Sequence, residues 1–193
     1  KVIVTADVDM TGYDWTPIAS FGEYEFDGGN FAIKGLNAPL FASTAANIKD
    51  LKVTDVNIVV TDLAHSGAIA CDLIGGSLYN CYTSGNVEIN NTTFDKEKSL
   101  GYYKDVCHGG VVGFANGATL EKCENYINLT VNSAWKEDTT PTEPLQLAAS
   151  AMFGVVDNGV TITECNNHGA LTINAAIKEG KHIAVGGVLA STS

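Results

Sequence analysis

Arginine does not occur in the sequence, and its absence removes the side chain that most often binds phosphates and carboxylates through two parallel hydrogen bonds. All 11 basic side chains are lysines, against 22 Asp and Glu, and the formal net charge is −11. Nucleic-acid binding depends on positive charge that neutralises phosphates, so we expect no nucleic-acid partner. No run of about 18 apolar residues occurs, so we also expect no transmembrane segment in this chain.

Helical periodicity is weak throughout, and the five cysteines lack the close CxxC spacing of zinc sites. The sequence also lacks a glycine-rich phosphate loop, a nucleophile elbow and a recognisable Ser-His-Asp arrangement. Only 17% of the residues are charged, which suits a β-rich protein with many small, uncharged polar side chains. These absences favour an all-β chain and leave no catalytic residues to name, so we expect no enzymatic activity.

What the sequence does contain is a repeat of three short segments, separated by Gly, Asn or Asp. The first segment occurs as NIKDL at 47–51, SLYNC at 77–81, TLEKC at 119–123 and TITEC at 161–165. The second occurs as VNIVV at 56–60, NVEIN at 86–90, NLTVN at 128–132 and ALTIN at 170–174. The third occurs as SGAIAC at 66–71, HGGVVG at 108–113, SAMFGV at 150–155 and VGGVLA at 185–190.

Repeated strands of this kind predict a solenoid whose equivalent strands stack into parallel sheets, and parallel crossovers are overwhelmingly right-handed. We therefore expect an all-β, right-handed parallel β-helix with three-stranded coils, about four to five coils, and loop insertions on one edge. The chain should form a single domain over 1–193 that belongs to a longer chain, because both ends lie in strand-like runs. Its expected parts are an N-terminal coil or cap at 1–45 and repeats at 46–75, 76–117, 118–159 and 160–193.

Alternation within the segments predicts which side chains point inward. Leu51, Cys81, Cys123 and Cys165 occupy one position of the repeat and should form one column, in which the cysteines are buried, reduced and hydrophobic. The alternative to free thiols is a disulfide between cysteines of adjacent coils. The remaining inward positions are Leu78, Leu120 and Ile162 in the first segment, and the pairs Val87/Ile89, Leu129/Val131 and Leu171/Ile173 in the second. Asn90, Asn132 and Asn174 end equivalent strands, which favours an asparagine ladder over three independent turn caps.

The first part of the chain carries a different pattern. The stretches ADVDMTGYDWTPIA at 6–19, YEFDGGNFAIKGLN at 24–37, PLFAST at 39–44 and IKDLKVTDVNI at 48–58 follow one another. This order resembles a family of bacterial surface proteins built from GLUG-type repeats, most specifically at Trp15-Thr16-Pro17-Ile18 and Phe26-Asp27-Gly28-Gly29. The sequence departs from the family pattern at Pro39-Leu40-Phe41, where Gly-Leu-Phe is usual.

The resemblance implies a β-helix on a secreted protein or on the bacterial outer cell surface, of the kind described as adhesin-like. The expected function is a non-catalytic module that contacts a host glycan or surface protein, or that serves as a surface scaffold. The alternative is a fragment of a β-helical carbohydrate-active enzyme, either a polysaccharide lyase or a glycosidase. A glycosidase requires two facing carboxylates, and the sequence shows no such pair.

Two groups of side chains suggest metal binding. Asp7, Asp9, Asp14 and Asp27 lie near one another in the sequence, and their oxygens suit calcium, although turn and capping carboxylates give the same pattern. The histidines are His65, His108, His168 and His182. We expect them at the surface or in turns, with His65 and the Cys107-His108 pair as neighbours on adjacent coils. Beyond calcium, the sequence indicates no cofactor.

The connection between the second and third segments lengthens from 61–66 to 91–108 and 133–150, and it always leaves the same point of the repeat. Insertions of a solenoid map to one face, which is often the binding face. The predicted ligand-binding residues are Trp135, Tyr102, Tyr103, Asp95, Glu137 and Asp138, because aromatic rings beside carboxylates suit sugars or proteins. Simple packing of the inserts on the solenoid is an equal alternative. Thr139, which follows Asp138, is a candidate for O-glycosylation.

Overall fold

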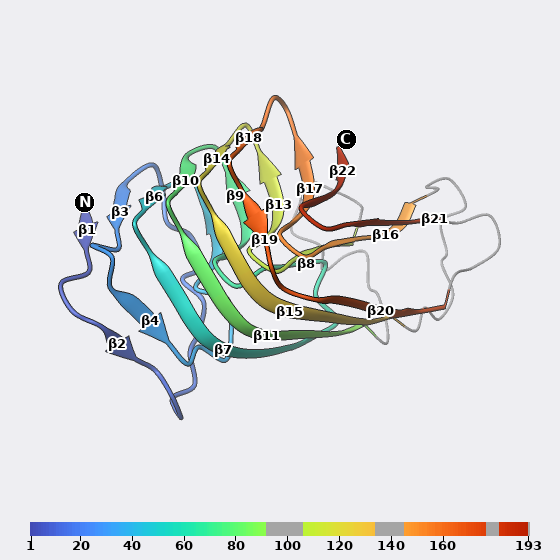
Figure 1. Ribbon diagram of the computed structural model, residues 1–193, viewed down its shortest axis with the longest axis horizontal. Coiled ribbons are helices and arrows are strands. Elements are labelled where there is room, and N and C mark those ends of the chain that lie inside the picture. The colour runs from blue at the N-terminus through green and yellow to red at the C-terminus, as the bar shows by residue number, and fades with distance from the viewer. Residues whose placement is uncertain (92–105, 134–144, 177–181, 193) are drawn as a thin grey trace.

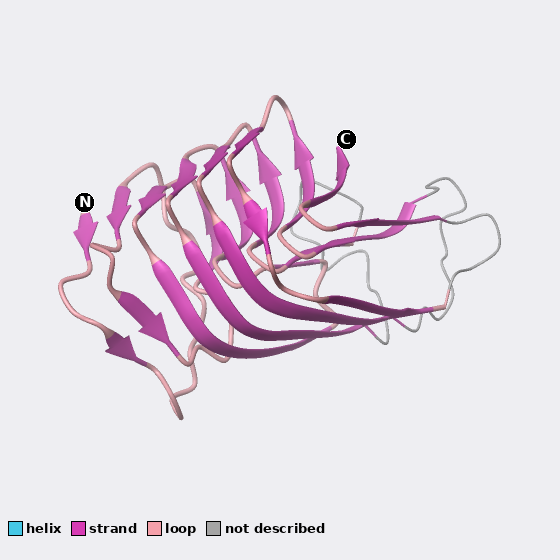
Figure 2. Ribbon diagram, viewed as in Figure 1, coloured by secondary structure: helices cyan, strands magenta, loops and turns pink. Residues whose placement is uncertain are grey.

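The computed structural model describes residues 1–91, 106–133, 145–176 and 182–192, and every regular element within them is a β-strand. The strands form four sheets, and their pairings are parallel (Figures 1 and 2). The predicted all-β class is confirmed, and the arrangement is consistent with a parallel β-helix.

The four sheets are named here by the strands that form them. Sheet A contains β1 (Val2–Ile3), β3 (Glu25–Asp27), β6 (Asn47–Lys49), β10 (Ser77–Tyr79), β14 (Thr119–Glu121) and β18 (Thr161–Thr163). Sheet B contains β2 (Val8–Asp9), β4 (Ala32–Lys34), β7 (Lys52–Thr61), β11 (Tyr82–Asn91), β15 (Glu124–Ser133), β19 (Asn166–Asn167) and β20 (Leu171–Ala175). Sheet C contains β5 (Phe41–Thr44), β9 (Ala70–Ile74), β13 (Val112–Asn116), β17 (Phe153–Asp157) and β22 (Leu189–Thr192). Sheet D contains β8 (His65–Ser66), β12 (Cys107–Gly109), β16 (Leu145–Ser150) and β21 (His182–Gly186).

From β6 onward the chain visits the sheets in the order A, B, D, C and then returns to A. Each return places a strand beside its equivalent in the preceding copy. The register follows the repeat of the sequence, since Leu78 pairs with Leu120 and Leu120 with Ile162. The stacking of equivalent strands that the repeat predicts is therefore present.

The third segment of each copy is two strands, not the single strand that the sequence analysis expects. Strands of sheet D and sheet C meet at a sharp corner, and glycine allows their backbones to approach closely. A Cβ atom added at Gly113 would lie 2.6 Å from the backbone nitrogen of Ser66, and one at Gly154 would lie 2.9 Å from that of His108. Each copy therefore contributes to four sheets instead of three.

The corner between sheets A and B repeats a left-handed backbone conformation. Asp50, Asn80, Lys122 and Glu164 have φ angles of 50°, 51°, 53° and 52°. Such angles are uncommon for residues with a Cβ atom, and their recurrence marks one conserved geometry from copy to copy. The residue after each of them starts the turn into sheet B, which brings Leu51, Cys81, Cys123 and Cys165 to equivalent positions.

These four residues form the predicted column. The backbone amide after each cysteine donates to the carbonyl of the column residue in the preceding copy: Tyr82 to Leu51, Glu124 to Cys81 and Asn166 to Cys123. All five cysteines are free thiols. Cys81 and Cys123 are buried as expected, whereas Cys165 is half-buried because it lies on the last described coil.

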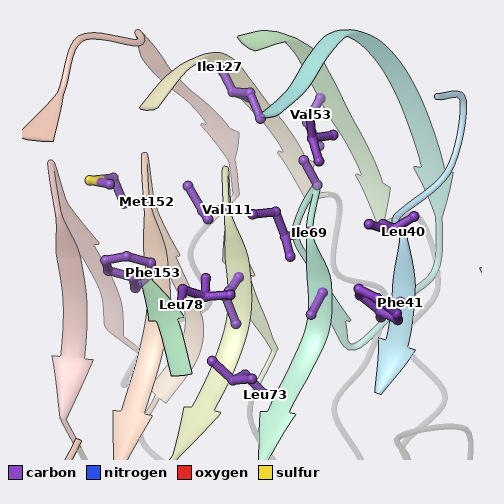
Figure 3. Packing of buried hydrophobic residues seen from close by; sticks show 14 of the residues in the cluster. Leu40, Phe41, Val53, Ile69, Leu73, Leu78, Val111, Ile127, Met152 and Phe153 are labelled. Carbon is purple, nitrogen blue, oxygen red and sulfur yellow. The ribbon is translucent and has the colours of Figure 1, made fainter. Parts of the chain in front are cut away.

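The interior between the sheets is filled by stacked aliphatic and aromatic side chains (Figure 3). The predicted inward residues of the second and third copies are buried: Leu78, Val87, Ile89, Leu120, Leu129 and Val131. Their equivalents in the last copy, Ile162, Leu171 and Ile173, are only half-buried. A smaller cluster of Cys107, Phe114, Ala148 and Val155 joins side chains from sheets D and C.

The asparagine ladder is confirmed on sheet B. The side-chain amide of Asn132 donates to Asn90 Oδ1 at 2.8 Å, and that of Asn174 donates to Asn132 Oδ1 at 2.9 Å. A second pair, Asn128 and Asn86, repeats the contact at 3.3 Å. Side-chain hydrogen bonds thus run from copy to copy along the stack, beside the backbone pairing.

The N-terminal motifs have structural roles. The Trp15 indole N–H donates to the Pro39 carbonyl at 3.0 Å, which ties the first turn of the chain to the second. Phe26 is buried in the core, and Asp27 Oδ1 accepts from the Gly29 amide at 3.0 Å. A Cβ atom at Gly28 would lie 2.4 Å from the Asp50 carbonyl oxygen, so glycine is required there.

Candidate functional site

The residues predicted to bind a ligand lie outside the described part of the chain. They are Asp95, Tyr102, Tyr103, Trp135, Glu137, Asp138 and the candidate acceptor Thr139. The structure does describe the points from which the two inserts leave. Asn91 ends β11, Ser133 ends β15, and the two residues pair directly in sheet B. The departure points are therefore adjacent, as the sequence predicts.

Buried polar side chains gather at the root of these inserts. His108 is fully buried, and its Nε2 lies 3.0 Å from the side-chain nitrogen of Asn91. Ser66 pairs with His108 in sheet D, as Ser133 pairs with Asn91 in sheet B. Within the described residues, His108 Nδ1, Asn91 Oδ1 and both serine hydroxyls have no hydrogen-bond partner. These polar atoms therefore gather where the two inserts leave sheet B.

His65 and His108 correct the expectation that the histidines lie at the surface or in turns. His65 is buried, and its Nδ1 lies 2.6 Å from Asp72 Oδ1. Burial, followed by the charge of His65, lowers the pKa of His108 to about 3, so its ring is neutral. The predicted neighbourhood is confirmed, because His65 pairs with Cys107 and Ser66 with His108. The structure does not describe the side chain of His182.

The four carboxylates considered for calcium act as caps and ion-pair partners. Asp7 accepts from the Ala32 amide and pairs with Lys34, while Asp9 accepts from the Thr11 amide. Asp27 lies 3.3 Å from Lys49, and Asp14 accepts from the Asn37 side chain. In the described ranges, no three His, Cys, Asp or Glu side chains converge as metal ligands.

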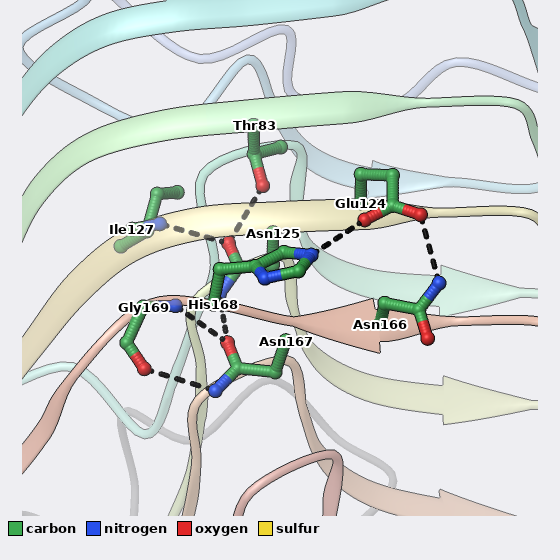
Figure 4. A network of polar contacts seen from close by, with 8 residues as sticks. All are labelled: Thr83, Glu124, Asn125, Ile127, Asn166, Asn167, His168 and Gly169. Carbon is green, nitrogen blue, oxygen red and sulfur yellow. Dashed lines mark hydrogen bonds and ion pairs between the residues drawn. The ribbon is translucent and has the colours of Figure 1, made fainter.

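The outer face of sheet B carries a group that the sequence analysis missed. The Tyr82 and Tyr126 rings are stacked with centroids 5.2 Å apart, and the His168 ring stacks on Tyr126 at 4.4 Å. Glu124 lies beside them, 2.9 Å from His168 Nε2 and 2.8 Å from the Asn166 amide nitrogen (Figure 4). Hydrogen bonding from Asn166, followed by His168, lowers the pKa of the Glu124 carboxyl.

The 42-residue period offers a signal for this group, since Tyr126 and His168 occupy the same position of successive copies. The Tyr126 ring stacks on two neighbouring rings, Tyr82 and His168. The group therefore combines stacked rings with one carboxylate, the phenol hydroxyls and an imidazole at the outer face of sheet B. Its chemistry is hydrogen bonding.

Behind this face, Asn125 connects the sheets through a fully buried amide. Its Oδ1 accepts from the Thr83 hydroxyl at 2.7 Å and from the Ile127 amide at 3.2 Å (Figure 4). Its Nδ2 donates to Asn167 Oδ1 and to the Ala151 carbonyl, both at 2.8 Å. Because both ends of the amide are satisfied, Asn125 has a structural role and is not a candidate ligand.

Comparison of the chain with protein-family models, curated proteins and solved structures gave no match. The described residues include no helix long and apolar enough to cross a membrane. The candidate sites are therefore two: the polar root from which the inserts leave, and the polar outer face of sheet B.

Proposed function

We propose that this chain is a right-handed parallel β-helix module of a secreted or bacterial outer-surface protein, related to the GLUG-repeat type. Its function is non-catalytic and adhesin-like: it contacts a host glycan or surface protein, or it serves as a surface scaffold. The parallel sheets and the fixed order in which the chain visits them support the β-helix, and parallel crossovers are overwhelmingly right-handed.

One observation carries the binding role, namely the regular hydrogen-bonding face that successive copies build on sheet B. Amide side chains recur at Asn90, Asn132 and Asn174, with Glu88 accepting from Asn132 at 3.3 Å. The inserts leave from the end of the same sheet, at Asn91 and Ser133. A ligand that lies along the stack would meet the same polar groups in each copy, which suits a polymer with repeated hydroxyl groups.

The inserts remain the predicted contact site, and a binding comparison tests them. The native chain and a Trp135→Ala/Tyr102→Ala/Tyr103→Ala variant would be measured on a glycan array and in a whole-cell adhesion assay. We expect at least a tenfold loss of binding in the variant. Tyr13→Ala is the matched control, because Tyr13 is 66% exposed and lies in the turn after β2, which β4 and β7 separate from the insert-bearing strand β11 in sheet B.

The binding results distinguish contact through the inserts, contact through sheet B and a scaffold function. Unchanged binding by the triple variant, with its circular dichroism intact, would remove the insert residues and move the contact to the face of sheet B. If the native chain bound neither glycans nor cells, the adhesin-like function would be wrong and the scaffold function would remain.

The alternative is a fragment of a carbohydrate-active enzyme. The exposed pair of Glu124 and His168 favours it, because a carboxylate 2.9 Å from an imidazole can transfer protons. Release of reducing ends or of unsaturated uronates from a polysaccharide panel, abolished by Glu124→Gln, would establish this alternative and refute the non-catalytic function.

A further inference from the structure

Three thiols occupy one repeated position in the stack, and their sulfur atoms are oriented alike. Each Sγ lies 3.5 Å from the carbonyl oxygen two residues earlier, at Tyr79, Glu121 and Thr163. The sulfurs of Cys81, Cys123 and Cys165 also lie 3.9, 3.9 and 3.6 Å from a carbonyl oxygen of the preceding coil. One side-chain orientation is therefore repeated three times along the column.

Because the orientation repeats, neighbouring sulfur atoms are separated by the spacing of stacked strands, about 4.8 Å. With the zinc–thiolate bond length of about 2.3 Å as a guide, two metal–sulfur bonds placed end to end span roughly 4.6 Å. A disulfide, in contrast, holds its sulfurs about 2.05 Å apart and would require the two strands to approach each other. The column thus fits a linear sulfur–metal–sulfur bridge better than a disulfide.

We propose that adjacent thiols of this column, Cys123 and Cys165 in the first place, bind a soft, two-coordinate d¹⁰ cation such as Hg²⁺, Ag⁺ or Cu⁺. Thiolates select soft metal ions. No described group offers the three or four converging side chains of a structural zinc site, whereas linear coordination requires only two. Cys165 is half-buried, whereas Cys81 and Cys123 are buried, so it is the most accessible thiol of the column.

Proton balance decides which ion fits best. A metal ion binds the thiolate form of cysteine, so each thiol loses its proton when the ion binds. A divalent ion displaces one proton from each of two thiols, forms two metal–sulfur bonds and leaves a neutral bridge. A monovalent ion leaves one negative charge in an apolar interior, which is unfavourable. We therefore expect Hg²⁺ to bind most tightly, with affinity that rises with pH as protons are released.

The arrangement of three thiols in line gives a sharp test by substitution. Removing an outer thiol leaves one adjacent pair: Cys123–Cys165 in Cys81→Ala, and Cys81–Cys123 in Cys165→Ala. Removing the middle thiol leaves Cys81 and Cys165 two coils apart, about 9.6 Å at the spacing of stacked strands, and no adjacent pair remains. Cys71→Ser is the matched control, because Cys71 lies on sheet C outside the column.

Each full-chain protein would be titrated with Hg²⁺ against a competing small thiol, with thiolate-to-metal absorbance and metal content as readouts. We expect one ion per chain in the native protein and in the Cys71, Cys81 and Cys165 variants, and at least a 100-fold weaker affinity in Cys123→Ala. Cys123→Ser is a second variant, and circular dichroism checks that both remain folded. Leu51 fills the equivalent slot of an earlier copy, which shows that the column does not need a thiol to pack.

X-ray absorption on the mercury-loaded protein adds a structural readout. Two sulfur neighbours at about 2.3 Å are expected for the linear bridge. Equal loss of affinity in all three column variants, native affinity in Cys123→Ala, or three or more sulfur neighbours would each overturn the proposal.

Discussion

The copy at 118–159 and the copy at 160–192 carry the same pattern of residues, yet they bury it to different degrees. Leu120 and Leu129 are 0% and 1% exposed, whereas their equivalents Ile162 and Leu171 are half-buried. The third copy has a paired copy on both sides, and the last has a described neighbour on one side only. Burial in this architecture therefore depends on stacking neighbours more than on the local sequence, which is typical of repeat proteins.

The largest effect on stability expected from this difference concerns Leu120 and Ile162, which occupy the same inward position in the two copies. Leu120→Ala should lower the free energy of unfolding by about 2–5 kcal/mol, because it opens a cavity in a packed interior. Ile162→Ala should cost less than half as much, at most about 2 kcal/mol, because solvent and side-chain movement fill the space. Urea unfolding of both variants measures the two costs, and equal costs would refute the idea that neighbours on both sides set the energetics.

The second prediction concerns how the stability of the fold depends on pH through the buried His108. The lowered pKa of His108 means that between about pH 6.5 and 3 the unfolded chain binds a proton that the folded chain does not. Stability should therefore decrease as the pH falls through this window, by up to about 1.4 kcal/mol per pH unit from this group. His108→Gln should flatten the slope, as measured by urea unfolding at a series of pH values.

The control for this experiment is a substitution in the last copy of the repeat. Thr172→Ala, an exposed change on β20 that removes no titratable group, should retain the slope of the native chain. A His108→Gln protein whose pH profile matched the native one would show that the buried histidine does not set the acid sensitivity.

The repeat itself could be predicted from the sequence because a few side-chain types mark it. The 42-residue period of Cys81, Cys123 and Cys165 located the column, and the equally spaced asparagines located the ladder. Both follow from local alternation and require no knowledge of how distant segments meet. The resemblance to surface proteins and the proposed function remain predictions, since they depend on a ligand or partner.

The misses have a common physical origin in the contacts between sheets. The segment HGGVVG reads as one strand, yet β12 ends at Gly109 in sheet D and β13 begins at Val112 in sheet C. The close approach of Gly113 to Ser66 is a contact between these sheets that the local sequence does not reveal. His108 is polar and next to glycine, so it suggested a turn, yet the return of sheet D against sheet B buries it. The stack of Tyr126 and His168 appears in the sequence only as one shared position of the repeat, and it forms only when adjacent coils stack.

The smallest expected effect separates the rungs of the asparagine ladder. Asn132 donates to Asn90 and accepts from Asn174, whereas Asn174 makes one ladder contact. A net hydrogen bond contributes about 0.5–1.5 kcal/mol, and exposure places these amides at the lower end. Asn132→Ala should therefore destabilise the chain by about 1 kcal/mol and Asn174→Ala by about half of that.

A double-mutant cycle shows whether the ladder is the cause. If the Asn132–Asn174 hydrogen bond is real in solution, the double variant should be less destabilised than the sum of the two single variants, because the shared bond is lost only once. Thr172→Ala is the matched control, as an exposed residue of the same strand β20 whose side chain makes no hydrogen bond to the described residues. Additive costs would mean that each asparagine acts alone as a cap. A coupling of even about 0.5 kcal/mol would mean that successive copies are joined by their side chains as well as by their backbones.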